Sequence, residues 1–320
     1  MNSKLEKYRQ LAQKLSLPLQ LQPWWWDAIC GDHWDVALVE ENNGDLLAAL
    51  PYVIIKKGGI SVLQQPPFTT YSGLWIKYPT DDGFKRPAQF AFEKKVFAAL
   101  ADQIPRVPFC SFHLSPGISN SLPFMWKGFT SSTRYTYLLD LNVGKDILFE
   151  NFKQSLRTDL RKPIEKLEIK TIDAIDEFYP LLKESYHNQG GTIPYKYETI
   201  QHLWKVLKEY QSGKLYLACH GDNNKPIAGL LTAWDAQKVH AVASGQSGDN
   251  KPGPIMAQLF WQAIQDHIGK QEVFDFEGSM VENIEHFLRG FGGHLTPYFR
   301  ISKTGNLFWD LVGKMSGKWT

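Results

Sequence analysis

The sequence predicts a mixed α/β protein, of an α+β-like kind, built from two tandem units. The first observation behind this prediction is a stretch, residues 238–279, that has the signals of a strand, a glycine loop, a helix and a strand in that order. The second observation is that the two halves of the chain resemble one another over comparable stretches. A duplicated unit in which strands and helices alternate explains both.

The stretch 238–279 carries the clearest local signals. An apolar run at 239–243 leads into a loop, 244–254, that is dense in Gly, Ser, Asn and Pro and can continue neither a strand nor a helix. Apolar residues then recur at helical spacing: Met256, Leu259, Phe260, Ala263, Ile264 and Ile268. Aromatic and β-branched residues at 273–277 predict a second strand, which Gly278 ends. The first turn of such a helix can hold a phosphate through its unpaired N–H groups and dipole, although an ordinary crossover with a polar loop remains an equal alternative.

The repeat between the halves predicts the domain organisation. A basic-Gly-Phe triplet occurs at 127–129 and again at 289–291. The number of residues between the two triplets is nearly the same as the number between the predicted strands 109–113 and 273–277. We therefore expect one unit at 1–143 and a second at 144–320. We expect the donor site in the second unit alone, because the first-half loop, 79–87, contains bulky Phe84 and acidic Asp81 and Asp82.

The remaining elements follow from periodicity and turn signals. In the first half we expect helices at 3–15, 23–30 and from Pro87 onward, and strands at 36–40, 46–55, 60–63, 73–76, 109–114 and 133–141. In the second half we expect helices at 146–166, 175–187, 197–210 and 280–289, strands at 215–220 and 228–233, and a hairpin at 296–302 and 307–310.

Composition narrows the class of protein. With 35 Lys+Arg against 33 Asp+Glu, the net charge of +2 shows no global bias toward nucleic acid or acidic membranes, although it leaves room for a local basic patch. The three cysteines are far apart and lack metal-ligand spacing. The first residues lack the apolar segment of a secretory signal peptide, and no apolar run elsewhere reaches membrane-spanning length. We expect a soluble cytoplasmic protein with no metal, no membrane span and no DNA partner.

The order of elements and several short motifs resemble tandem GNAT proteins of the FemAB-like kind. Residues 246–257 occupy the position of the family's donor loop, and SLRTDLRKPIEKLEIK at 155–170 resembles its basic helix. The motifs FDFEGS, RGFGG and PYFRISK, at 274–279, 289–293 and 297–303, are similar to the end of the FemAB-like domain. The resemblance covers nearly the whole chain and implies two GNAT-type units, each a mostly antiparallel mixed sheet flanked by helices.

The resemblance also implies an N-acyltransferase that moves an acyl group from acyl-CoA to the amine of an acceptor. Loop 246–253 departs from the Q/R-x-x-G-x-G/A pattern of many acetyltransferases, which leaves the donor open. FemAB-like enzymes use aminoacyl-tRNA, so an aminoacyl-tRNA-dependent peptidyl transferase is the alternative, and a non-catalytic GNAT-fold binding module is a third reading. The expected donor-binding residues are Gln246, Gly248, Lys251, Gly253, Ile255, Met256 and Ala257.

The chemistry of N-acyl transfer needs a group that accepts a proton from the amine. Asp275 and Glu277 lie two apart on the predicted strand, so both are candidates, with a buried structural role as the alternative for Asp275. Tyr298 is a candidate donor of a proton to the leaving thiolate, and a core tyrosine is its alternative reading.

Basic residues recur every four positions at Lys153, Arg157 and Arg161. Such a stripe can meet the phosphates of tRNA, a nucleotide or CoA, although stripes of this kind are usually only solvated.

Overall fold

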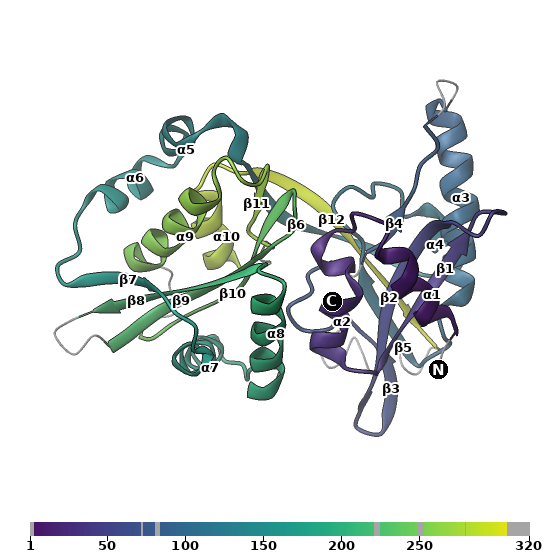
Figure 1. Ribbon diagram of the computed structural model, residues 1–320, viewed down its shortest axis with the longest axis horizontal. Coiled ribbons are helices and arrows are strands. Elements are labelled where there is room, and N and C mark those ends of the chain that lie inside the picture. The colour runs from purple at the N-terminus through teal and green to yellow at the C-terminus, as the bar shows by residue number, and fades with distance from the viewer. Residues whose placement is uncertain are drawn as a thin grey trace. The chain divides into compact units, whose positions relative to one another are not determined.

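The computed structural model describes residues 3–71, 73–80, 84–220, 225–248, 253–278 and 280–305. The chain forms two compact units (Figure 1). The first unit comprises Met1–Arg134 together with Pro297–Thr320, and the second comprises Tyr135–Thr296.

The first unit is built on a mixed sheet whose strand order is β1-β2-β3-β5-β12. Its strands are β1 (Trp34–Glu40), β2 (Leu46–Lys57), β3 (Ile60–Leu63), β5 (Phe109–His113) and β12 (His294–Thr304), and β4 (Trp75–Ile76) also pairs with β2. Among the described strand pairs of this unit, β3 and β5 run parallel and the others run antiparallel. Its helices are α1 (Ser3–Ala12), a 3₁₀ turn (Leu19–Leu21), α2 (Pro23–Cys30), α3 (Arg86–Gln103) and α4 (Leu122–Trp126).

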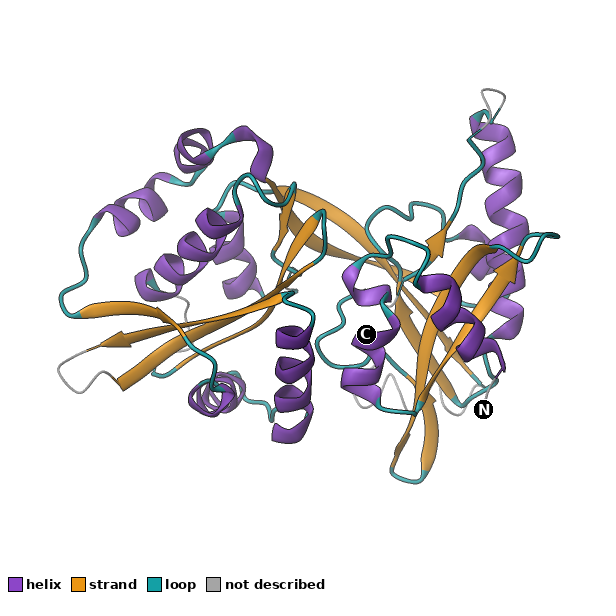
Figure 2. Ribbon diagram, viewed as in Figure 1, coloured by secondary structure: helices purple, strands orange, loops and turns teal. Residues whose placement is uncertain are grey.

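The second unit has the strand order β6-β11-β10-β9-β8-β7. These strands are β6 (Thr130–Asp140), β11 (Val273–Asp275), β10 (Lys238–Gln246), β9 (Lys225–Trp234), β8 (Gly213–His220) and β7 (Leu167–Thr171). In the described residues of this unit, β10 and β11 pair in parallel, and the other strand pairs are antiparallel. Helices α9 (Pro254–His267) and α10 (Glu282–Arg289) lie on one face of this sheet, and α7 (Tyr179–Asn188) and α8 (Tyr197–Glu209) lie on the other (Figure 2). Helices α5 (Lys145–Asn151) and α6 (Gln154–Arg161) precede β7.

The two sequence halves exchange their final strands. In the first unit, β5 pairs antiparallel with β12, through Arg300 opposite His113. In the second unit, β11 pairs antiparallel with β6, through Val273 opposite Asp140. The compact units therefore differ from the predicted division into 1–143 and 144–320. That division describes a sequence repeat and stays a prediction.

Most predicted elements match the structure, and two differ for local reasons. The predicted helix 146–166 is divided into α5 and α6, because Phe152 adopts an extended conformation and buries its ring 5.1 Å from Trp261 and 5.3 Å from Phe291. The strand predicted at 273–277 ends at Asp275, because Glu277 and Gly278 have φ values of +57° and +65°. Strand β7 and helix α4 were not predicted, and 307–310 lie outside the described residues.

Candidate functional site

The site begins where two parallel strands of the second unit separate. Strands β10 and β11 pair from Lys238 opposite Val273 to His240 opposite Asp275, where β11 ends. Beyond His240, in the described residues, β10 pairs only with β9, with an irregularity between Ala241 and Ala243. The strands thus form a fork with one open strand edge.

The open edge of β10 presents backbone hydrogen-bonding groups. The backbone N–H of Ser247 donates to the carbonyl of Ile227 in the loop-side end of β9, at 2.8 Å. Because bonded and non-bonded residues alternate in an antiparallel pair, the backbone N–H and C=O of Ser244 and Gln246 point away from β9. Ser244 is exposed, so its backbone is accessible to a ligand that lies along the edge.

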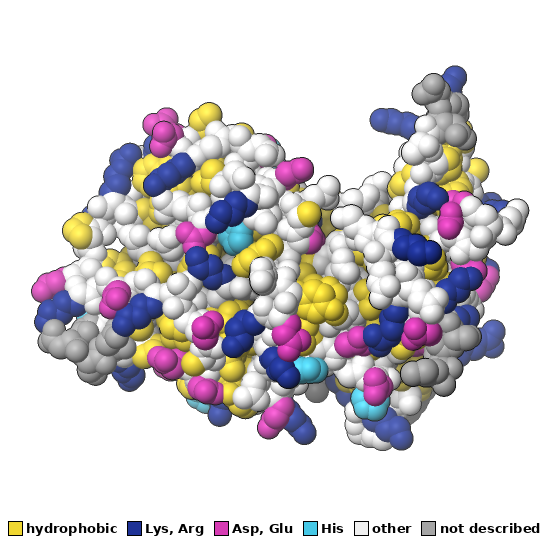
Figure 3. Space-filling view, viewed as in Figure 1, with side chains coloured by type: hydrophobic (Ala, Val, Ile, Leu, Met, Phe, Trp, Pro, Cys, Tyr) yellow, Lys and Arg dark blue, Asp and Glu magenta, His cyan; other side chains and the backbone are white. Residues whose placement is uncertain are grey.

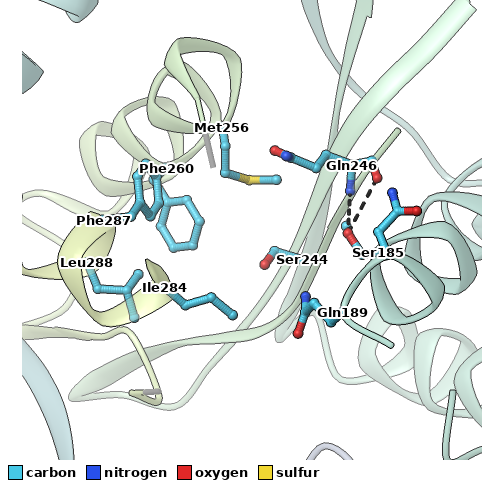
Figure 4. A pocket seen from close by; sticks show the side chains of 11 residues that line it. Ser185, Gln189, Ser244, Gln246, Met256, Phe260, Ile284, Phe287 and Leu288 are labelled. Atoms are coloured by element: carbon cyan, nitrogen blue, oxygen red, sulfur yellow. Dashed lines mark hydrogen bonds between the residues drawn. The ribbon is translucent and has the colours of Figure 1, made fainter. Parts of the chain in front are cut away.

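A narrow cavity of about 70 Å³ lies along this edge (Figure 4). Its polar side consists of β10 and α7, with Ser244, Gln246, Ser185 and Gln189. Its opposite side is apolar and comes from α9 and α10, with these residues: Met256, Phe260, Ile284, Phe287 and Leu288. A slot with a strand edge on one side and apolar side chains on the other suits an extended chain that alternates amides with methylene groups.

Helix α7 is fixed against the end of β10. The backbone N–H of Gln246 donates to Ser185 Oγ at 2.9 Å, and the N–H of Gly248 donates to Glu184 Oε1 at 2.9 Å. A Cβ on Gly245 would lie 2.7 Å from the backbone carbonyl carbon of Leu181, so only glycine allows this close approach. The wall of the slot is therefore held by the backbone of α7 as well as by its side chains.

A carboxylate–imidazole pair lies at the apex of the fork. Glu277 Oε1 is 3.0 Å from His240 Nδ1, and the two side chains are only 8% and 5% exposed. Glu277 has a positive φ, which is uncommon for a residue with a side chain and is often associated with functional sites. If Nδ1 carries a proton that it donates to Glu277, the imidazole Nε2 can accept another.

Asp275 has a structural environment. Its side chain is fully buried, and its Oδ1 accepts hydrogen bonds from Thr136 Oγ1 at 2.7 Å and from the backbone N–H of Glu277 at 2.8 Å. Lys238 Nζ lies 3.4 Å from Oδ2. These contacts match the structural alternative for Asp275, and they hold the backbone that presents Glu277.

A second cavity, of about 410 Å³, lies beside the first turn of α9. Gly253 and Ala257 line it, together with Lys153 at the start of α6 and His286 of α10. Lys153 Nζ is 3.2 Å from His286 Nε2, so a lysine and a histidine lie near the helix terminus. Asp159 also lines this cavity. The backbone N–H groups of the helix terminus, with Lys153, can hold an anionic group.

The predicted donor residues divide among several places. Gln246 and Met256 line the narrow slot, whereas Gly253 and Ala257 line the second cavity. Two hydrogen bonds join the backbone of Gly248 to α7. Its N–H donates to Glu184 Oε1, and its carbonyl accepts from Asn188 Nδ2 at 2.6 Å. Ile255 packs against the core of the unit, and Lys251 lies outside the described residues.

Tyr298 belongs to the first unit, whereas Asp275 and Glu277 belong to the second. It is 5% exposed, and its ring contacts Tyr71 at 5.0 Å and His113 at 5.6 Å between centroids. Burial lowers the pKa of neighbouring His113 to about 4. This environment is that of a core tyrosine.

The basic stripe is only partly solvated. The Arg161 guanidinium lies 5.2 Å from the ring centroid of Phe149, and Arg157 Nε is buried without a hydrogen-bond partner among the described residues. Of the three stripe residues, Lys153 belongs to the lining of the second cavity, and Arg157 and Arg161 do not.

Several site residues were not predicted from the sequence. His240 reads as one residue of an apolar strand, and its pairing with Glu277 depends on the register of β10 against β11. Ser185 lies within the predicted helix 175–187, and no sequence signal distinguishes it from its neighbours. The serine and glutamine residues at the end of α7 are a weak signal, because polar residues near a helix end are common on solvated surfaces.

No group of three or more His, Cys, Asp or Glu residues in the described ranges could hold a metal ion. None of the helices formed by those residues is both long and apolar enough to cross a membrane.

Comparisons with solved structures identify the fold. The chain is similar to FemX, with 11% identity, a TM-score of 0.61 and coverage of 93% of this chain and 96% of that chain. It is also similar to L-PGS from Bacillus licheniformis, with 12% identity, a TM-score of 0.54 and coverage of 97% and 96%. A tandem GNAT protein from the clavulanic acid biosynthesis pathway has 8% identity, a TM-score of 0.54 and coverage of 95% and 96%.

No protein-family model matches the chain, and no curated protein matches it by sequence. At these identities, the likeness to solved structures establishes the fold. The chain has the tandem GNAT fold, so the predicted fold class and the FemAB-like resemblance are confirmed at the level of structure.

Proposed function

We propose that this protein is an N-acyltransferase that moves an acyl group from acyl-CoA to the amine of an acceptor, with the donor bound by the second unit. The observation that carries the proposal is the fork between β10 and β11, with the narrow slot on its open edge and the pair Glu277–His240 at its apex. The tandem GNAT fold supports the same reaction class.

The slot favours the pantetheine arm of CoA as its occupant. This arm alternates amide groups with short methylene segments, so its amides can pair with the backbone of Ser244 as an added strand would. Its methylene groups then lie against Phe260 and Phe287. The slot is narrow, which favours an extended chain over a bulky ligand.

The phosphates of CoA are assigned to the first turn of α9. Gly253 begins this turn with an open position where a Cβ would meet nothing within 4 Å, so a phosphate oxygen can approach the backbone. Lys153 adds a positive charge nearby, and Asp159 opposes it.

In the proposed reaction, the neutral amine of the acceptor attacks the thioester carbonyl carbon. A C–N bond forms, the tetrahedral intermediate collapses, and the C–S bond breaks to release the CoA thiolate. The proton lost by the amine passes to the Glu277–His240 pair. The thiolate takes up a proton from water, and the pair then gives its proton to the hydroxide left behind, which restores its starting state. We assign Asp275 to holding the backbone of Glu277, and we assign Tyr298 no part in the reaction.

Aminoacyl-tRNA is the second candidate donor, and its phosphates would use the same second cavity as the phosphates of CoA. This cavity is larger than the slot, and Lys153 lines it while Arg161 extends the basic side of α6. Nucleic-acid phosphates bind such basic surfaces with a strong salt dependence, which CoA binding to a narrow slot does not share to the same degree. Salt titration therefore separates the two donors.

Calorimetric titration with acetyl-CoA tests the donor site. Gly253→Glu places a negative charge at the start of α9, and we expect affinity to fall about tenfold or more, the cost of losing a charge-assisted contact. Gly117→Glu is the matched control, because it adds the same charge at an open position in the first unit. Equal weakening by both variants contradicts the assignment. No binding of acetyl-CoA to the unaltered protein favours the tRNA donor or a non-catalytic binding module.

Turnover with a panel of amine acceptors tests the proton acceptor. Glu277→Gln keeps the size of the side chain but removes its basicity, so we expect kcat to fall by about a hundredfold or more with little change in donor affinity. His240→Gln should lower kcat and shift its pH profile. An unchanged kcat in Glu277→Gln would contradict the role of Glu277 as proton acceptor and would indicate a structural role.

A further inference from the structure

A cluster of large apolar side chains lies exposed on the first unit, on α3 and α4. Trp126 is 62% exposed, Phe90 55%, Leu122 51% and Met125 46%. We call these four residues the α3–α4 patch. Isolated exposed apolar residues are ordinary, but a cluster of this kind marks an interaction surface.

The patch rests on a rigid base. Beneath it, Phe124 is fully buried and stacks on Phe97 with a centroid distance of 5.9 Å. Glu93 is also buried, where it accepts hydrogen bonds from Tyr78 at 2.8 Å and from Asn120 at 2.7 Å. These contacts tie α3 to the loop before α4, so the exposed side chains are presented by a packed scaffold.

Exposed basic side chains lie along the part of α3 that carries Phe90. Lys85, Arg86, Lys94 and Lys95 are all exposed at the start and along the middle of α3. Between residues 84 and 99 the only acidic residue is the buried Glu93, while Asp81 and Asp82 lie outside the described residues. Figure 3 shows hydrophobic and basic side chains together at the surface over α3.

Lys94 and Trp126 form a cation–π contact on this surface. Lys94 Nζ lies 5.3 Å from the ring centroid of Trp126. A shallow hollow of about 500 Å³, lined by Phe90, Lys94, Leu122 and Trp126, lies between the two helices. The apolar side chains and the ammonium groups are therefore available to one and the same partner.

We propose that the α3–α4 patch docks on the surface of an anionic lipid bilayer. Tryptophan is favoured at the boundary between headgroups and acyl chains, and lysine can place its stem on apolar surface while its ammonium reaches a lipid phosphate. The cores of protein–protein interfaces are depleted of lysine, so the same composition fits a second copy of this chain less well. The modest net charge of +2 does not oppose the proposal, because attraction to anionic lipids depends on charges near the surface.

Flotation with lipid vesicles tests the proposal. The full chain is mixed with vesicles of phosphatidylcholine alone or with phosphatidylglycerol added, and we expect binding to the anionic vesicles only. Trp126→Ala should weaken binding about fivefold to twentyfold, from the loss of apolar burial. Replacing Lys94 and Lys95 together by Gln should weaken it about fivefold per charge, and added salt should reduce this effect.

Matched controls lie on the second unit. Leu295→Ala removes an apolar side chain of similar exposure, 54%, and Lys205→Gln removes a lysine on α8 whose side chain is 72% exposed. Both controls should bind vesicles as the unaltered protein does. Equal weakening by the controls, equal binding to neutral vesicles, or no binding to either vesicle overturns the proposal.

Fluorescence quenching by brominated lipid locates the contact. Trp126→Phe keeps an aromatic ring, so vesicle binding should persist while part of the quenching is lost. Quenching equal to that of the unaltered protein would place Trp126 away from the bilayer and overturn the proposal. A change of oligomeric state in Trp126→Ala, without vesicle binding by the unaltered protein, would instead assign the patch to contact between copies of the chain.

Discussion

The contact between α7 and β10 can be tested by adding a single methyl group. In Gly245→Ala, the new Cβ would lie 2.7 Å from the backbone carbon of Leu181 and 2.7 Å from the backbone nitrogen of Leu182. Contacts this short must be relieved, and rotation of a side chain cannot relieve them because both partners are backbone atoms. Helix α7 must therefore move away from β10.

The expected cost follows from measured effects of overpacking. Inserting a methyl group into a well-packed site typically destabilises a protein by about 1–3 kcal/mol. For a unit of this size, each kcal/mol lowers Tm by about 2–4 °C, so we expect a decrease of about 2–12 °C. Movement of α7 also lengthens the bonds between Ser185 and Gln246, which widens the slot and weakens donor binding.

Thermal unfolding followed by circular dichroism measures the first effect, and calorimetric titration with acetyl-CoA measures the second. Gly253→Ala is the control for Tm, because it lies in the same unit and its Cβ would meet nothing within 4 Å. That control should leave Tm unchanged or raise it slightly, since alanine restricts the unfolded chain. A Gly245→Ala variant with the Tm and donor affinity of the unaltered protein would refute the close packing of α7.

Three further predictions concern stability. Asp275→Asn should lower the free energy of unfolding by about 1–3 kcal/mol in urea titration, because the buried carboxylate loses its charge opposite Lys238, and an unchanged midpoint would contradict this. Gly278→Ala should destabilise by about 3 kcal/mol or more in the same assay, since its Cβ would overlap the Tyr135 carbonyl oxygen at a φ of +65°, and near-normal stability would disprove the close approach. The pKa of His113 is lowered to about 4 from 6.5, so the unfolded state binds the proton more tightly and stability should fall as pH drops from about 6.5 to 4, by about 3 kcal/mol. His113→Gln should remove this part of the pH dependence in urea titrations at the two pH values, and a slope that persists would assign it to other groups.

Local patterns predicted the parts of the fold that depend on local interactions. The apolar spacing after Pro254 predicted α9, and the residues at those positions, among them Met256, Leu259 and Ile264, are buried in the core. Periodicity and turn signals predicted the strands at 36–40 and 46–55, and in the turn that joins β1 and β2 the Asp45 N–H donates to Asn43 Oδ1 at 3.0 Å. These signals need only a few neighbouring residues.

The candidate site was harder to predict, because it depends on contacts between residues far apart in the sequence. His240 and Glu277 come from different strands, and only the register of β10 against β11 brings them together. Tyr298 follows the site elements in the sequence, yet the pairing of β12 with β5 places it in the first unit. Residue types alone indicate neither register nor strand exchange.

The exchange of β6 and β12 also constrains the order in which the protein folds during synthesis. The second unit is continuous in the chain, so all of its strands are available once residue 296 has been made. The first unit lacks the antiparallel partner of β5 until residues 300–304 follow, so the edge of β5 stays unpaired while the whole second unit is translated. Exposed strand edges promote aggregation, so chaperone dependence should be greatest during this interval. A gene divided at the repeat boundary would leave β5 and β11 in separate polypeptides, each without its exchanged partner strand, so the two fragments should be insoluble alone and should regain solubility when co-expressed.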